Sequence, residues 1–264
     1  MASSDLTKGT IMGVKKTVRG VFVAGVCVCL AVLNGVSVAA GKGEAHWGYE
    51  GAEGPDNWGK AFPTCGIGKS QSPIDITGPF KTVSDPIKVS YKESALKVLN
   101  NGHTIQVNYD SGSSMQIGKQ SYELLQFHFH RPSEEKLGGK AKPMVAHFVH
   151  KSKEGKLAVI GVLIDEGKDN PLISTVWANL PKETGKENVV QKVKINASKF
   201  LPSSLGYYHF MGSLTTPPCS EEVAFYILKN TAQVSKAQVE AFPYKMNARP
   251  VQSLNGRQVA ESGK

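Results

Sequence analysis

Apolar and polar side chains alternate, or β-branched apolar residues run together, in several short segments of the chain. Both patterns are typical of β-strands, and the strongest examples are residues 96–99, 105–109, 122–130, 145–149, 157–164 and 223–228. Residues 157–164 are apolar on both faces, so we expect this strand at the centre of a sheet. Asn100-Asn101-Gly102, between the first two segments, favours a tight hairpin because Asn and Gly adopt positive φ at little cost.

Helical patterns are few and short. Asn170 and Pro171 are typical of the start of a helix, and the apolar positions of residues 173–180 follow them. Ser235 and Gln238 have the spacing of a capping box before Val239. The sequence therefore predicts a mainly β fold, with a large twisted, predominantly antiparallel central sheet and a few short peripheral helices.

The first 40 residues differ in character from the rest of the chain. Basic residues at positions 15, 16 and 19 precede an apolar run over 21–38, and small residues follow at 39–41. This order is typical of a secretory signal peptide, residues 1–40, and predicts one folded domain over 41–264 without membrane attachment after cleavage. An uncleaved anchor is the alternative, although Gly25, Asn34 and Gly35 weaken the run as a spanning helix. Either case places the folded domain outside the cytoplasm, periplasmic or secreted.

The charge distribution excludes one class of function. The formal net charge is +9, and removal of residues 1–40 takes away four basic residues and one acidic residue, which leaves +6. Basic and acidic residues alternate along the remaining chain, with no basic stripe and no interleaved aromatic residues. We therefore do not expect nucleic-acid binding.

The cysteines fit an exported protein. Cys27 and Cys29 would leave with the signal peptide, and Cys65 and Cys219 would remain as the only pair. An oxidising compartment favours a disulfide between these two, with two buried free thiols as the alternative. The bridge would close a loop of about 155 residues, for which chain entropy gives on the order of 5 kcal/mol as an upper value.

The most specific chemical pattern lies in residues 126–130, where His128 and His130 alternate with Phe127 and Phe129. Because strand residues two apart share a face, the histidines project together and the phenylalanines enter the opposite core. His147 follows His130 by seventeen residues, in the strand predicted over 145–149. If the two strands are neighbours, three imidazoles can bind a tetrahedral Zn²⁺ with one position open to water, as in catalytic zinc sites. Strand histidines satisfied by hydrogen bonds are the alternative.

Several ordered blocks extend this pattern over nearly the whole predicted domain. They are residues 46–49 (HWGY), 54–55 with Trp58, 71–74 (QSPI), 100–103 (NNGH), 126–130 (QFHFH), 132–134 (PSE), 146–150 (AHFVH), 212–219 (GSLTTPPC) and 247–250 (NARP). Together they resemble the α-class carbonic anhydrases, of the exported bacterial type. The resemblance implies a catalytic domain over 41–264, with one Zn²⁺ per chain bound by His128, His130 and His147. It also implies reversible hydration of CO₂ to bicarbonate and a proton by zinc-bound hydroxide.

The resemblance further assigns roles in turnover. Thr215 would accept a hydrogen bond from the zinc hydroxide and donate one to Glu134, and a carboxylate that can only accept would fix this orientation. Thr216 would contact bicarbonate. His103 would carry the proton to buffer, because an unperturbed imidazole pKa of about 6.5 suits transfer in both directions.

Two further groups of side chains complete the implied site. The chain of waters that leads to His103 would be held by Tyr49, Asn101 and Gln106, the last one methylene longer than the usual asparagine. The apolar pocket for CO₂ would be lined by Val149, Val159 and Leu214. Phe225 stands where tryptophan is usual, so we expect this pocket to be slightly larger.

The resemblance also implies partners for the zinc ligands. Gln126 would hold His128, and the backbone carbonyl of Asn247 would hold His130. The glutamate that is usual two residues before the third ligand is Val145 here, and a valine cannot accept a ring proton. The sequence therefore predicts that His147 lacks its partner, with zinc affinity or exchange altered by about 10 to 100-fold. Repacking is expected around two other departures, Glu135 for histidine and Phe210 for tyrosine.

Two other interpretations remain open at this point. A cupin-type barrel would use His128, His130 and Glu134 as direct ligands, but Tyr122 and Lys151 replace the glycine and asparagine of its motifs. The second interpretation is a zinc-binding module that keeps the carbonic anhydrase fold but does not catalyse the reaction.

The sequence also allows expectations for His150 and for the binding partners of the protein. His150, near His147 in sequence, is expected to be structural, because a fourth histidine ligand would close the site to water. CO₂ and bicarbonate are the expected partners, and exported members of the family are often homodimers.

Overall fold

The structure is a computed structural model that describes residues 45–263. The signal peptide predicted for residues 1–40 lies outside the described residues and stays a prediction. Within residues 45–263, no helix is long and apolar enough to cross a membrane.

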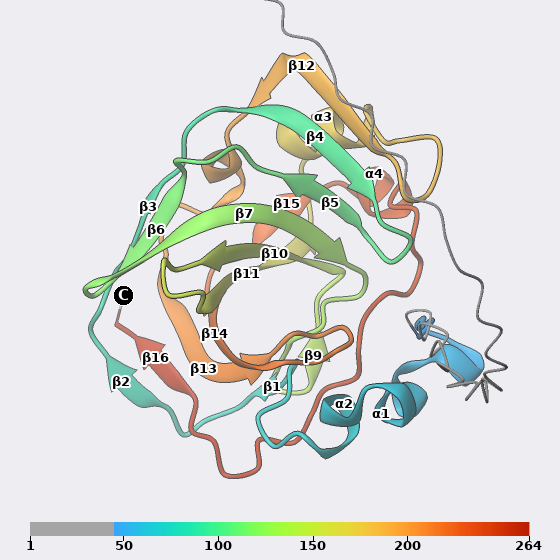
Figure 1. Ribbon diagram of the computed structural model, residues 1–264. Helices are drawn as coiled ribbons and strands as arrows, with labels where there is room; N and C mark the ends of the chain where they lie inside the picture. The colour runs from blue at the N-terminus through green and yellow to red at the C-terminus, as the bar shows by residue number, and fades with distance from the viewer. Residues whose placement is uncertain (1–44, 264) are drawn as a thin grey trace, which may run out of the picture. The chain divides into compact units, whose positions relative to one another are not determined.

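Strands dominate the described residues, and most of them join one large sheet (Figure 1). Its main path runs through β12 (Glu187–Ile195), β4 (Ser94–Asn100), β5 (Ile105–Asn108), β7 (Gln120–His130), β10 (Met144–Lys151), β11 (Leu157–Glu166), β14 (Glu221–Leu228), β13 (Tyr207–Ser213), β16 (Ala260–Ser262) and β2 (Lys81–Val83). Off this path, β6 (Ser114–Ile117) pairs with β7 and with β3 (Ile87–Ser90), and β15 (Ala232–Val234) pairs with β11. The pairs β11–β14, β11–β15 and β16–β2 are parallel, and the other pairs of this sheet are antiparallel.

The remaining elements are small and peripheral. A second sheet contains β1 (Asp75–Ile76), β8 (Lys136–Leu137) and β9 (Lys140–Ala141). The helices are α1 (Trp58–Ala61), α2 (Pro63–Ile67), α3 (Pro171–Trp177) and α4 (Lys236–Glu240), together with three 3₁₀ turns at Gly51–Glu53, Pro55–Asn57 and Ala197–Phe200. The predicted fold class is confirmed.

All six predicted strands are present, as β4, β5, β7, β10, β11 and β14, although β5 ends one residue before the predicted range of 105–109. β11 lies between β10 and β14, and its residues 158–164 are buried, as its apolar character on both faces predicts. β4 and β5 form the expected hairpin, with Gly102 at a φ of 90°. The caps are also confirmed, because Asn170 accepts from the backbone at the start of α3 and Ser235 and Gln238 form a capping box before α4.

β7 separates two apolar regions, and this separation creates the site. Phe127 and Phe129 are buried in the larger core on one face of the strand. His128 and His130 alternate with them and therefore occupy the opposite face. Val145 on β10 and Phe225 on β14 belong to a smaller apolar cluster on that side.

The disulfide between Cys65 and Cys219 is confirmed, with the two Cα atoms 5.1 Å apart. Cys65 lies in α2, and Cys219 ends the segment that carries Thr215 and Thr216 after β13. Both cysteines are buried and pack with Trp58. The bridge therefore ties the segment after β13 to the amino-terminal part of the domain.

Replacing Cys65 and Cys219 together by alanine is expected to lower the free energy of unfolding. The bridge spans a sequence separation of 154 residues, so it restricts the unfolded chain strongly, and bridges of this kind contribute about 2–4 kcal/mol. Urea unfolding of the mature protein would show a lower midpoint for the variant. The parent protein with its disulfide reduced is the control, and its midpoint should be close to that of the variant. A variant midpoint equal to that of the oxidised parent would contradict the prediction.

Candidate metal centre

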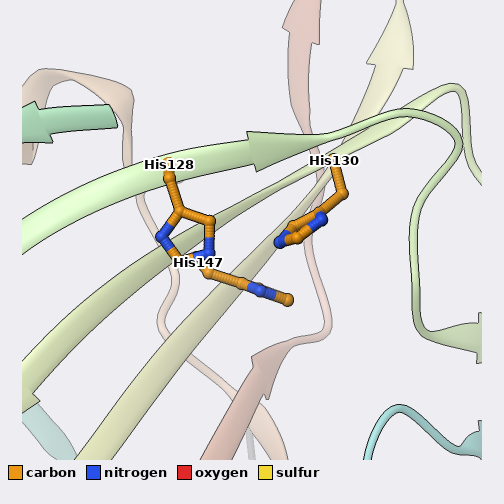
Figure 2. A group of neighbouring side chains, drawn as sticks. All are labelled: His128, His130 and His147. Atoms are coloured by element: carbon orange, nitrogen blue, oxygen red, sulfur yellow. The ribbon is translucent and has the colours of Figure 1, made fainter. Parts of the chain in front are cut away.

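The structure brings the three predicted zinc ligands together. β7 and β10 are antiparallel neighbours, and the Cα atom of His147 lies opposite that of His128, with His130 two residues further along β7. One nitrogen from each ring lies within 4.8 Å of the other two. Figure 2 shows the three rings pointing toward one another from the two strands.

In His128 and His130, the ring nitrogen that points away from the other two histidines is hydrogen-bonded to an oxygen that can only accept. Nδ1 of His128 donates to the side-chain oxygen of Gln126 at 2.8 Å, and Nδ1 of His130 donates to the backbone carbonyl of Asn247 at 2.7 Å. Both rings therefore carry the proton on Nδ1 and turn the lone pair of Nε2 inward. Nε2 of His130 is buried without a hydrogen-bond partner among the described residues, as expected of a nitrogen that binds a metal.

His147 also has a partner, and the prediction that it lacks one is wrong. Its Nε2 lies 3.1 Å from Oε2 of Glu135, and both side chains are buried. The segment after β7 places Glu135 beside the ring, and Val145 is part of the small apolar cluster. With the proton held on Nε2, the lone pair of Nδ1 turns toward the other two histidines. The donor set thus fits a metal ion that accepts three neutral imidazoles.

Burial and neighbouring charges act differently on the three rings. Burial lowers the pKa of His128 to about 3 and holds the pKa of His130 well below its ordinary value, so both rings are neutral at pH 7. Burial also acts to lower the pKa of His147, but Glu135, followed by Glu134, outweighs it and the pKa is raised. Of the three rings, only His147 is therefore shifted toward its protonated form, by the two neighbouring carboxyl groups.

Glu134 lies behind the histidines and is almost completely buried. Its Oε1 accepts from the backbone N–H of Arg249 at 2.9 Å, and its Oε2 lies 3.4 Å from Nε2 of His130. Burial raises the pKa of Glu134 to about 8. The Thr215 hydroxyl is close enough to lower that pKa, although no hydrogen bond of normal geometry joins these two described side chains.

A cavity of about 170 Å³ opens onto the three histidines. Its walls contain every residue predicted to bind substrate or hold waters, namely Val149, Val159, Leu214, Thr216, Tyr49, Asn101 and Gln106, and also His103, Thr215, Gln126 and Phe225. Glu134 and Asn247 are not in its walls and act from behind them. The sequence thus identified the set of residues that the fold assembles around one cavity.

The polar side of the cavity leads to His103. Its ring stacks on Trp47 with the ring centroids 3.6 Å apart, and partial burial, followed by the charge of His46, lowers its pKa. The side-chain oxygen of Asn101 accepts from the backbone N–H of His103 at 2.9 Å. The Tyr49 hydroxyl is buried and has no hydrogen-bond partner among the described residues.

His150 is not a fourth ligand. The pairing of β10 with β7 shifts register between Val149 and His150. The His150 ring is fully buried, and its Nε2 lies 2.7 Å from the hydroxyl oxygen of Tyr91. Sequence reasoning missed the contacts of Glu135, Trp47 and Arg249, although the last two lie in the matched blocks over 46–49 and 247–250.

Comparison with known proteins identifies the family. A family model described as eukaryotic-type carbonic anhydrase matches residues 53–263. The chain belongs to the α-carbonic anhydrase family. A carbonic anhydrase of Neisseria gonorrhoeae is 43% identical over 241 residues, which are 89% of this chain and 95% of that protein. One from Pectobacterium atrosepticum is 40% identical over 233 residues, 86% of this chain and 95% of the relative.

Comparison with solved structures leads to the same family. The α-carbonic anhydrase of Thermovibrio ammonificans, in complex with the inhibitor sulfanilamide, is 43% identical and superposes with a TM-score of 0.79. The match covers 83% of this chain and 100% of that one. The predicted carbonic anhydrase family is confirmed, and the cupin-type barrel is wrong because the matched fold is that of an α-carbonic anhydrase.

Proposed function

We propose that this carbonic anhydrase catalyses the reversible hydration of CO₂ to bicarbonate and a proton, with one Zn²⁺ bound by His128, His130 and His147. The strongest support is that each ring has its outer nitrogen hydrogen-bonded and its inner nitrogen close to the other two. Zinc held by three imidazoles lowers the pKa of water to about 7, a value taken from carbonic anhydrases themselves, and so supplies hydroxide at neutral pH.

The walls of the cavity suit an apolar substrate on one side. Val149, Val159, Leu214 and Phe225 line it next to the histidines. CO₂ carries no charge and needs a small dry space rather than a charged clamp, and these side chains keep water out of that space. Phe225 provides an aromatic wall, in line with the pocket expected from the sequence.

Thr215 and Glu134 would orient the attacking oxygen. A bound Zn²⁺ nearby would favour the ionised form of Glu134 over the protonated form that burial favours. Glu134 can only accept when ionised, and one of its oxygens is taken by the backbone of Arg249. The other oxygen is free to accept from the Thr215 hydroxyl, which then has its lone pairs directed into the cavity. Thr216 lines the same cavity and would contact bicarbonate.

Replacement of His103 by alanine is expected to slow turnover in dilute buffer. The ring lines the cavity, and its lowered pKa keeps it neutral at pH 7 and ready to accept the proton released by hydration. Stopped-flow rates at low buffer concentration would measure the loss, and added imidazole should restore part of the rate. An unchanged rate in dilute buffer would show that another group carries the proton.

The same proposal includes export. Residues 1–40 would be removed and residues 41–264 would form a periplasmic or secreted enzyme, which agrees with the Cys65–Cys219 disulfide. Mass spectrometry of the protein recovered from an exporting host should give a chain that begins at Gly41. A chain that begins at Met1 or Ala2 would favour an uncleaved anchor.

Stopped-flow CO₂ hydration by the mature protein tests the reaction itself. The proposal predicts hydration far above the rate of buffer alone. Bound zinc without hydration would favour a binding module of the same fold.

A further inference from the structure

We propose that Glu135 is the residue that positions His147 for metal binding, from the segment after β7 rather than from β10 itself. This inference rests on the proposed function, in which His147 binds zinc. It assigns a role to a buried carboxylate for which the sequence analysis expects only repacking.

The geometry supports the assignment. Oε2 of Glu135 lies 3.1 Å from Nε2 of His147, and the two side chains are 0% and 3% exposed. Because an ionised carboxylate can only accept, the ring proton stays on Nε2 and Nδ1 faces the cavity. Nδ1 is also the nitrogen on the side of Glu134, whose Oε2 is 3.8 Å away. Loss of the Glu135 acceptor would free the ring to take the other tautomer, which cannot present this lone pair.

β10 offers no acceptor of its own. Val145 and Val149 lie two residues before and after His147 on the same face of the strand, and neither side chain can accept a hydrogen bond from the ring. Val145 is fully buried in the cluster that also contains Leu163 and Phe210. None of these three side chains has a polar atom, so they offer the His147 ring no acceptor.

The segment that carries Glu135 is held in place on both sides. The Ser133 hydroxyl donates to the backbone carbonyl of Glu135 at 2.7 Å, and the backbone N–H of Ser133 donates to the carbonyl of Lys142 at 2.9 Å. The N–H of Lys136 donates to the carbonyl of Ile74 at 3.3 Å. A carboxylate on a fixed backbone can restrict the ring, whereas one on a mobile loop could not.

The three histidines therefore have unequal partners. The acceptors of His128 and His130, which are the Gln126 side chain and the Asn247 carbonyl, are neutral, whereas the acceptor of His147 is a carboxyl group. Oε1 of Glu135 has no hydrogen-bond partner among the described residues, so the bond to His147 is the main compensation for burying this carboxylate. Zinc retention therefore depends on the Glu135–His147 pair.

The test compares zinc loss from Glu135→Gln with that from the parent protein in the presence of a chelator. Glutamine keeps the size of the side chain and removes its charge, so we expect zinc to leave about 10 to 100-fold faster. Glu166→Gln, the same change at an exposed position, is the matched control and should lose zinc at the parental rate. Adding Val145→Glu to Glu135→Gln supplies a carboxylate from β10 and should slow the loss again.

A second measurement does not depend on zinc or on the variant. In ¹H–¹⁵N spectra of metal-free parent protein, recorded at a pH high enough that all three rings are neutral, His147 should carry its single proton on Nε2, while His128 and His130 carry theirs on Nδ1. Zinc loss from Glu135→Gln at the parental rate, or an Nδ1-protonated His147, would overturn the role of Glu135. A parent protein that binds no zinc at all would instead overturn the proposed function on which that role rests.

Discussion

Replacement of His130 by alanine is expected to remove zinc and CO₂ hydration together. His130 is the most enclosed of the three ligands on β7 and β10 that face the cavity, at 1% exposure, and its Nε2 has no other hydrogen-bond partner among the described residues. Without it, two imidazoles remain, which is too few for a stable zinc site of this type. A metal ion contributes several kcal/mol to the transition state, and about 4 kcal/mol corresponds to roughly a 10³-fold loss in rate.

The comparison requires a histidine that lies outside the site. His209 donates from Nδ1 to the carbonyl of Phe225 at 2.9 Å and does not line the cavity, so His209→Ala should retain zinc and most of the rate. Zinc by atomic absorption and CO₂ hydration by stopped flow would be measured on the same samples. Full activity in a metal-free His130→Ala protein would rule out the proposed mechanism.

Replacement of Thr215 by alanine is expected to lower kcat/KM for CO₂ by about 10²–10³-fold, the usual cost of losing one oriented hydrogen bond at a reacting oxygen. Zinc content should stay unchanged, because Thr215 lines the cavity and is not part of the histidine group. The loss would come from a nucleophile that is no longer aligned by the link to Glu134. Thr82→Ala, at an exposed position of β2, is the control and should leave the rate unaffected.

Glu134→Gln separates this role from direct ligation. Oε1 of Glu134 is occupied by the backbone N–H of Arg249, and Oε2 lies behind the histidines rather than in the cavity wall. The variant should therefore retain zinc and lose rate, as Thr215→Ala does. Loss of zinc from Glu134→Gln, or a parental rate in Thr215→Ala, would contradict the assigned roles.

Strand periodicity was sufficient to predict the parts of the fold that build the site. In β7, bulky Phe127 and Phe129 alternate with His128 and His130, and only one register buries the first pair and exposes the second to a cavity. β12 was missed because it is an edge strand whose exposed face carries Lys, Glu and Gln, which hide the alternation. β13 was missed because its burial does not alternate regularly along the strand.

The partner of His147 could not be predicted from local sequence. The spacing of Val145 and His147 shows only that β10 has no acceptor on that face, whereas the contact to Glu135 depends on how the segment after β7 folds back. Local patterns report which residues share a face, but a contact between a strand and a loop depends on tertiary packing. The available signal was the combination of two departures: the usual acceptor is missing at Val145, and an unexplained carboxylate is present at Glu135.

The measurement that tests the central claim most directly is a zinc titration of the metal-free mature protein, with stopped-flow CO₂ hydration and bound zinc determined at each point. The account predicts that the rate rises in proportion to bound zinc and reaches its plateau at one Zn²⁺ per chain. A hydration rate that is independent of bound zinc, or a plateau of bound zinc without hydration, would contradict it.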